Sequence, residues 1–328
     1  MKSTKILLVL TVLSVICKTG FAQKRDSLTT KLIAVVADKF ANARALNFEL
    51  SGSAPYNFTS EILGKGTQTG RITNWMQIRA NANLNFIQTG KWILGANFSY
   101  RHTSVTAALD EPLAGINSSL KGNLQYHSSS LNLTRIVRVF GKTTILSGSV
   151  SVDGSEKKFE RTKGLFATTI LLKANAKTRL GVGFMVNIDP SAQLPALPIF
   201  TFEHRFNNGL IADITLPRNI YLRKHVLKYG RLSIGTELDR TGFYLYNQDN
   251  SGRTFEYNQV DVNSGLTYEH LVFNYFVVTL KGGMRASLSP RIFDRNQSYR
   301  DPIFETKPDP SAYFNAGISF NPFAKKRK

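Results

Sequence analysis

The sequence predicts an all-β fold, an antiparallel transmembrane β-barrel of about 12–14 strands. Residues 76–86 alternate apolar and polar side chains over eleven positions without exception, a longer run than soluble half-buried strands usually show. Segments of about ten residues with this alternation recur from residue 45 onward, separated by polar connections. Because neighbouring side chains on a strand point to opposite faces, one face suits lipid and the other a polar lumen. The rival fold, a secreted soluble β-sandwich or adhesin, would have a polar outer face.

The amino terminus has the layout of a secretory signal peptide over residues 1–22. Lys2 and Lys5 precede an apolar run, and Gly20 and Ala22 supply small residues before a cleavage site after Ala22. The apolar run covers about eleven residues, whereas a membrane-spanning helix needs roughly 20. A lipoprotein anchor at Cys17 is not expected, because the bulky Ile16 stands where a small residue is required. Cleavage removes the single cysteine, which excludes disulfides and thiolate metal sites from the mature chain.

The chain is strongly basic, with a formal net charge of +20 that falls to +17 when the signal peptide and its three lysines are removed. Such a charge is common in nucleic-acid-binding proteins, but export argues against that partner, and the arginines are scattered along strands. We expect a basic lumen and basic loops near lipid phosphates or small anionic solutes. The mean hydropathy of −0.16 agrees with a barrel, since alternating strands average out, and no later stretch reaches 18 consecutive apolar residues.

Residues 23–44 form an N-terminal periplasmic segment in the predicted domain scheme. Apolar side chains recur at helical spacing between Asp26 and Ala43, and Asp26 is suited to cap such a helix. Three roles remain open for this helix: a short periplasmic helix, a plug in the lumen, or a tether.

Residues 45–323 form the predicted barrel, and residues 324–328 form a basic tail. Trp92 and Tyr100 belong to an outward apolar face, and we assign Leu124 and Tyr126 to the same lipid-facing side. Further strands are expected at 143–153, on both sides of 175–177, and at 200–206, 210–216, 219–227, 231–246, 254–268, 273–287 and 312–321.

The connections between strands are alternately short and long, as in outer-membrane barrels. The longest are 54–70, 103–118 and 288–311, and the strand count is fourteen only if Leu216-Pro217 is itself a tight turn. If 219–227 is instead a loop, the count is twelve. The short turns are expected at 88–90, 141–142, 175–177, 207–209, 228–230 and 269–272.

Two motifs carry a resemblance to known proteins. The segment 315–320, Asn-Ala-Gly-Ile-Ser-Phe, resembles the carboxy-terminal signal of Gram-negative outer-membrane proteins, although the basic tail follows where a terminal Phe is usual. The strand–Pro–strand pattern over 214–223 is similar to a feature of uncharacterised Gram-negative outer-membrane β-barrel families. The whole mature chain resembles these families. The resemblance implies a bacterial outer-membrane location, contact with outer-membrane lipid and lipopolysaccharide, and insertion by the barrel-insertion machinery.

Six charged residues share the polar faces of their strands and are the candidates for lining the lumen. They either line a conduit, in which unpaired arginines favour anions, or pair across strands and fill the bore. The expected function is therefore a passive pore or small-solute transporter, and the alternative is a structural or adhesive barrel with a filled lumen. The six residues are Arg79, Arg101, Arg179, Glu203, Arg205 and Asp213.

Enzymatic activity is not expected. His127 and Ser129 are similar to the His-x-Ser pair of outer-membrane lipid deacylases, but the lipid-facing assignment of Tyr126 turns both toward the lumen, and no carboxylate is placed to orient the imidazole. A lipid-modifying enzyme is thus the weakest alternative. The five histidines lack metal-ligand spacing, so no metal or other cofactor is predicted. Aromatic residues suited to girdles at the membrane interfaces, or simply to sheet packing, are Trp92, Tyr100, Tyr126, Tyr244 and Tyr246.

Overall fold

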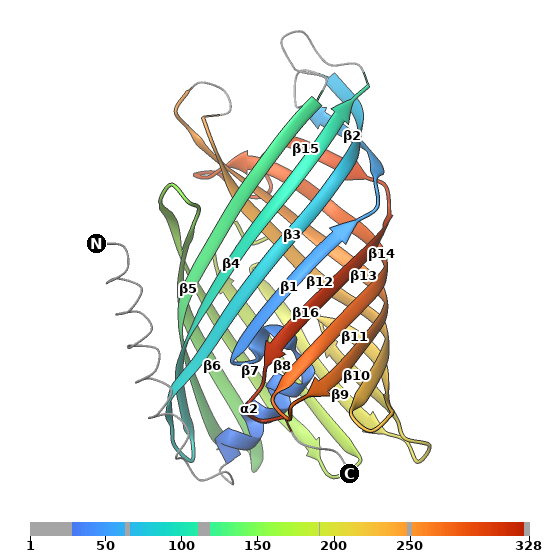
Figure 1. The fold of residues 1–328 in the computed structure, drawn as a ribbon. Coiled ribbons are helices and arrows are strands. Elements are labelled where there is room, and N and C mark those ends of the chain that lie inside the picture. The colour runs from blue at the N-terminus through green and yellow to red at the C-terminus, as the bar shows by residue number, and fades with distance from the viewer. Residues whose placement is uncertain (1–27, 63–65, 111–118, 190, 248–250, 325–328) are drawn as a thin grey trace, which may run out of the picture.

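The computed structural model describes residues 28–62, 66–110, 119–189, 191–247 and 251–324, and shows one antiparallel sheet closed into a barrel (Figure 1). The predicted signal peptide and most of the basic tail lie outside these residues. The sheet contains sixteen strand segments. Segments β1 and β2 both pair with β3 and together occupy one position in the wall, and β15 and β16 both pair with β14 and occupy another. The wall therefore has fourteen strand positions. The predicted antiparallel barrel is confirmed.

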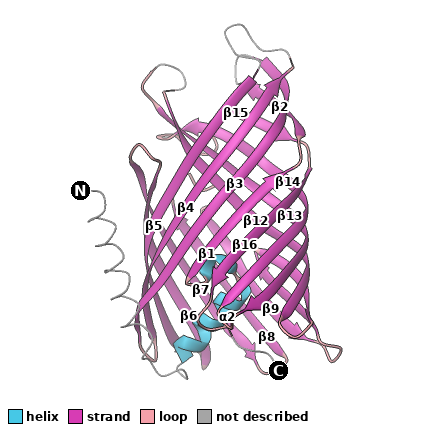
Figure 2. Cartoon of the chain, viewed as in Figure 1, coloured by secondary structure: helices cyan, strands magenta, loops and turns pink. Residues whose placement is uncertain are grey.

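The strands occupy nearly the whole described chain, and the helices are confined to its beginning (Figure 2). The helical elements are α2 (Leu28–Lys39) and the 3-10 turn η1 (Ala41–Ala43). The strands are β1 (Leu46–Ser53), β2 (Tyr56–Ile62), β3 (Gly66–Gln88), β4 (Trp92–Leu109), β5 (Ser119–Val139), β6 (Lys142–Gly154), β7 (Phe159–Ala174), β8 (Thr178–Ile188), β9 (Ala196–Arg205), β10 (Leu210–Leu216), β11 (Asn219–Val226), β12 (Gly230–Tyr246), β13 (Thr254–Val272), β14 (Phe276–Asp294), β15 (Pro302–Pro308) and β16 (Ser311–Phe320).

The barrel closes where the first strand pairs with the last. Leu46 lies opposite Phe320, and the pairing continues to Ser53 opposite Tyr313. This pairing satisfies the backbone groups of β1 and β16 that would otherwise form open edges. Open sheet edges do not occur in hydrocarbon, because each unpaired backbone group there costs several kcal/mol. The closing segment is also the one that carries the outer-membrane resemblance.

Large apolar side chains cover the outside of the wall. Ala82 on β3 lies between Leu46 of β1 and Phe98 of β4, and both of these side chains are exposed. Leu131 on β5 is 60 % exposed, which would be costly in water but suits lipid. Since the outer face is apolar and the inner face polar, the protein is a bacterial outer-membrane barrel. Within the described residues, no helix is long and apolar enough to span a membrane.

Exposed aromatic rings surround the end of the barrel that carries the short turns. Phe140 and Phe273, in the turns after β5 and β13, are 96 % and 83 % exposed, and Phe206 and Tyr275 are also exposed. Aromatic rings at this position are typical of the girdle at a membrane interface. Sequence reasoning placed the girdle on strand residues and missed these turn residues, because turns are normally expected to be polar.

The turn at Leu216-Pro217 confirms the fourteen-strand alternative. Strands β10 and β11 are joined by Pro217 and Arg218 alone, and the Leu216-Pro217 peptide bond is cis. The other short turns lie near their predicted positions, except that the turn between β13 and β14 is formed by 273–275 rather than 269–272.

The three longest predicted loops are wrong, because much of each is strand. Residues 56–62 form β2, β4 continues to Leu109, and β14 continues to Asp294 with β15 following. Strands β2 and β15 lie at the upper, loop end of the barrel in Figure 1, where both faces of a strand can meet water. Without lipid on one side, the apolar alternation that marks a membrane strand is lost.

The β10–β11 hairpin is shorter than its neighbours. Its strands have seven and eight residues, whereas membrane strands usually need about 9–11. Strand β12 pairs with β11 only as far as Glu237 and then continues to Tyr246 with β13 as its only strand partner. Beyond the hairpin, β12 approaches β5 across the barrel. The wall at this height is therefore completed by side-chain contacts.

Helix α2 lies inside the lower part of the barrel in Figure 1, near the short turns. Lys39 at its end reaches Asp213 at 2.7 Å and Glu203 at 2.9 Å. Arg44, which is 1 % exposed, bonds to Glu269 and Ser319 on the wall. Of the three roles left open by the sequence, this position corresponds to a lumen plug. We call residues 28–44, which comprise α2, η1 and Arg44, the plug.

The lipid-facing assignment of β3 can be tested by exchanging charge between its two faces. We expect Ala82→Arg to impair barrel insertion strongly, because an arginine on the lipid face near the midplane costs about 2–4 kcal/mol. Asn81→Arg, one position away on the lumen face, should insert far better. The measurement is the yield of folded protein in the outer membrane, and equal yields would contradict the assignment.

Candidate solute site in the lumen

A cavity of about 120 Å³ lies within the lumen, and we call it the chamber. On the short-turn side it is bounded by Lys39 and Asn42 at the end of the plug. The wall around it is built mainly from lumen-facing positions of seven strands, so its polar character follows from the strand alternation. Six cations and four carboxylates line it: Lys39, Arg79, Arg218, Arg223, Lys281 and Arg285, with Glu49, Glu237, Asp239 and Glu269.

Most of these charges are paired with a charge of opposite sign. Arg79 of β3 bonds to Asp239 of β12, on the opposite wall. Lys281 of β14 lies 2.5 Å from Glu237 of β12, which also accepts a hydrogen bond from the Tyr221 hydroxyl at 2.9 Å. Charges removed from water need such partners, because an unpaired ion in a confined interior carries a large desolvation cost. The Arg79–Asp239 pair therefore joins two distant parts of the wall, whereas the Lys281–Glu237 pair bridges the two neighbours of β13.

Two guanidinium groups of the chamber have no carboxylate partner among the described residues. Arg285 donates through Nε to Asn263 at 3.0 Å and lies over the ring of Trp75 at 4.2 Å. Arg218, in the β10–β11 turn, donates to Asn42 at 2.6 Å and stacks on Phe40 of the plug. Both retain N–H groups able to donate to an anion.

Several buried polar atoms of the chamber wall also lack hydrogen-bond partners within the described structure. They are both side-chain polar atoms of Asn219, Nε of Arg223, Oγ1 of Thr279 and Oδ1 of Asn315. An unpaired buried polar atom costs about 1–3 kcal/mol, so such atoms are rare in a filled core. Five of the eleven such atoms in the described residues thus belong to chamber-lining residues, which is consistent with a place that accommodates water or a polar solute.

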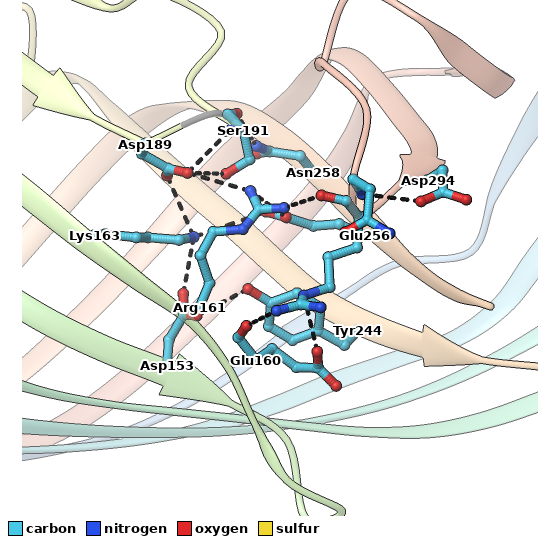
Figure 3. Close-up of polar contacts among 12 residues, drawn as sticks. Asp153, Glu160, Arg161, Lys163, Asp189, Ser191, Tyr244, Glu256, Asn258 and Asp294 are labelled. Carbon is cyan, nitrogen blue, oxygen red and sulfur yellow. Dashed lines mark hydrogen bonds and ion pairs between the residues drawn. The ribbon is translucent and has the colours of Figure 1, made fainter. Parts of the chain in front are cut away.

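A second cluster of charges lies toward the loop end, and we call it the clamp (Figure 3). Lys163 of β7 lies 2.8 Å from Asp153 of β6 and 3.3 Å from Asp189 in the β8–β9 loop. Arg161, also on β7, bridges Asp189 at 3.3 Å and Glu256 of β13 at 3.1 Å. The clamp thus connects β6, β7 and the loop to β13.

The clamp closes the wall beyond the short hairpin. Tyr244 of β12 donates to Asp153 at 2.8 Å, and Arg240 donates to Ser191 of the β8–β9 loop at 3.4 Å. Ser191 in turn donates to Asp189 at 2.7 Å. Burial raises the pKa of Asp189, but Lys163 and the Ser191 hydrogen bonds lower it more, so this pKa lies below its ordinary value. The Asp189 carboxylate therefore remains ionised in mildly acidic solution.

The six charged residues singled out in the sequence fall into two groups. Arg79 pairs with Asp239 across the bore, and Arg101 lies 6.0 Å from the Tyr126 ring on the next strand. The other four lie near the plug and surround its Lys39: Arg179 and Arg205 pair with Glu203, and Arg223 pairs with Asp213. The structure does not bring the two groups together; the chamber lies between them, bounded by the plug.

The assignment of Tyr126 to the lipid face is wrong. Its hydroxyl donates to buried Asp153 at 2.7 Å, so it faces the lumen. Tyr244 and Tyr246 likewise bond to Asp153 and Ser155 and are not girdle residues. The pairing of β4 with β5 has no register break, and exposed Leu131 fixes odd-numbered positions of β5 outward.

His127 and Ser129 consequently face outward. The prediction that these two side chains face the lumen is therefore wrong. The His127 ring lies edge-on to exposed Phe159 at 5.2 Å. Among the described residues, no group of three or more His, Cys, Asp or Glu side chains could hold a metal ion.

Sequence reasoning missed most of the chamber. Glu237, Asp239, Lys281 and Arg285 alternate with apolar neighbours on their strands, which was the available signal for a lumen-facing position. Their convergence depends on strands far apart in the sequence, and the pairing of Arg79 with Asp239 spans 160 positions.

No family model and no curated protein sequence matches the chain. Among solved structures, an outer-membrane channel from Pseudomonas putida F1 is 9 % identical, with a TM-score of 0.37 over 84 % of this chain and 96 % of that one. The transport unit of the Escherichia coli autotransporter AIDA-I is 7 % identical, with a TM-score of 0.36 over 94 % and 96 %. Outer membrane phospholipase A from Escherichia coli is 9 % identical, with a TM-score of 0.32 over 82 % and 96 %. These likenesses concern barrel architecture alone.

Proposed function

We propose that the protein is a channel or transporter for small solutes, with the chamber on the solute path. The observation that carries this proposal is the polar chamber itself, bounded on the short-turn side by the end of the plug. Helix α2 is not a strand of the wall, and the contacts of Lys39 with Glu203 and Asp213 and of Arg44 with Glu269 are made by side chains. Such contacts can break without disrupting the sheet. A closed state with the plug seated, in exchange with an open state, fits this arrangement.

The alternative is a structural barrel with a filled lumen, and the Arg79–Asp239 pair across the bore favours it. The chamber argues for the transport role, because a lumen evolved only for packing would pair Asn219 and Thr279 with neighbours. A lipid-modifying enzyme finds less support. The His127 imidazole has no carboxylate hydrogen-bonded to it among the described residues, and it packs against Phe159.

Release of the plug should open the pore. In the double variant Lys39→Ala/Arg44→Ala, Lys39 no longer pairs with Glu203 and Asp213, and Arg44 no longer pairs with Glu269. Hydrogen bonds to charged groups contribute about 1.5–3 kcal/mol each, so the open population should rise at least about tenfold. The measurement is single-channel conductance in a planar bilayer.

The matched control is Lys91→Ala/Lys142→Ala, which removes the same charge from exposed positions at the short-turn end. It should conduct like the wild type. If folded wild-type and plug-released proteins both fail to conduct, the filled-lumen alternative is correct.

An open pore should prefer anions modestly. The six cations and four carboxylates around the chamber leave an excess of positive charge, and fixed charge in a confined conduit attracts counter-ions. The preference should weaken at high salt, because the Debye length shortens from about 10 Å at 0.1 M to 3 Å at 1 M. The reversal potential of the plug-released variant under a KCl gradient measures it, and a clear cation preference at low salt would contradict this reading of the lumen.

A further inference from the structure

We propose that the chamber is a binding site for a small hydroxylated organic anion, of the class of sugar acids. The inference rests on the proposed function only in treating the chamber as a place that a solute reaches. Three features carry it: two guanidinium groups without a carboxylate, neutral wall groups without hydrogen-bond partners, and the volume of the cavity.

The guanidinium groups select an anion. Arg285 makes its one side-chain hydrogen bond within the described residues through Nε, which leaves its terminal nitrogens able to hold a carboxylate with two parallel bonds. The rings of Trp75 and Tyr313, 4.2 and 5.4 Å from its guanidinium carbon, fix the plane of the group. Arg218 adds a second positive charge at the turn.

The neutral groups select hydroxyls. Among the residues that line the chamber, Asn219 has a side-chain donor and acceptor without a partner in the described structure, Thr279 has a hydroxyl, and Asn315 has an amide oxygen. A sugar hydroxyl donates and accepts at once, so it suits such mixed groups better than an alkyl chain or a second carboxylate does. A ligand that carries one carboxylate and several hydroxyls satisfies both kinds of wall group.

The volume limits the size of the ligand. A cavity of about 120 Å³ holds roughly ten waters at 10–15 Å³ each. A sugar acid of about six carbons fits this space, whereas an oligosaccharide or a lipid does not. The chamber is thus matched to a monomeric solute.

The test uses the full mature protein in detergent and three probes: D-glucuronate, D-glucose and acetate. Glucuronate combines the carboxylate with hydroxyls, and each of the others lacks one of them. Isothermal titration calorimetry should show saturable binding of glucuronate, at least tenfold tighter than binding of glucose or acetate. Equal affinities for glucose and glucuronate, or no heat of binding, would overturn the proposal.

Trp75 reports where the probe binds. The chain has two tryptophans, so the Trp92→Phe background leaves Trp75, which stacks on Arg285, as the single fluorophore. Glucuronate should change its emission with the same midpoint as the calorimetric titration. Binding that leaves Trp75 emission unchanged would place the site outside the chamber and reject the inference.

Variants identify the groups that hold the anion. Arg218→Gln and Arg285→Gln should each weaken glucuronate binding at least tenfold, while Arg300→Gln, in the exposed β14–β15 loop, should leave it unchanged. Heat-modifiable migration on gels checks that each barrel is folded, and Arg218→Gln decides alone if Arg285→Gln does not fold. Full binding by folded Arg218→Gln would overturn the role assigned to the guanidinium groups. Binding without conductance in the same preparation would contradict the proposed channel but support the binding site. Conductance without binding would support the channel but contradict the binding site.

Discussion

Closure of the sheet is the constraint on which the other features depend. In hydrocarbon, a backbone N–H or C=O without a partner costs several kcal/mol, so β1 and β16 must pair and the wall must have no open edge. Once the sheet is closed, strand alternation leaves each residue facing either lipid or a confined interior. Apolar residues such as Leu131 are exposed for this reason, and the charged residues converge on the lumen.

The confined interior then decides how charges are arranged. The Arg79–Asp239 pair offsets the loss of water by joining opposite walls, the Lys281–Glu237 pair does so between strands on either side of β13, and Lys39 does so between plug and wall. Two cations beside the chamber, Arg218 and Arg285, have no carboxylate partner among the described residues. The groups that remain free to bind a solute thus lie where there is room for one.

The short β10–β11 hairpin explains why the wall beside β12 is held partly by strand pairing and partly by side-chain contacts. The hydrogen bonds between β11 and β12 end at Glu237, and beyond that point this side of β12 relies on Tyr244, Arg240 and the β8–β9 loop. Side-chain contacts of this kind are individually weak compared with a continuous strand ladder. The plug and the clamp are therefore the parts of the lumen whose rearrangement leaves the sheet intact.

The sequence by itself determined the barrel, its fourteen-strand alternative through Leu216-Pro217, and the polar face of β3, because alternation and turn chemistry are local properties. It misplaced Tyr126 and treated 54–70 as a loop, because outside the lipid band an apolar side chain no longer marks the outer face. It also left the helix between Asp26 and Ala43 without a position. The tertiary structure alone decided which charges meet, since Arg79 and Asp239 become neighbours only when barrel closure brings distant strands to opposite sides of one narrow lumen.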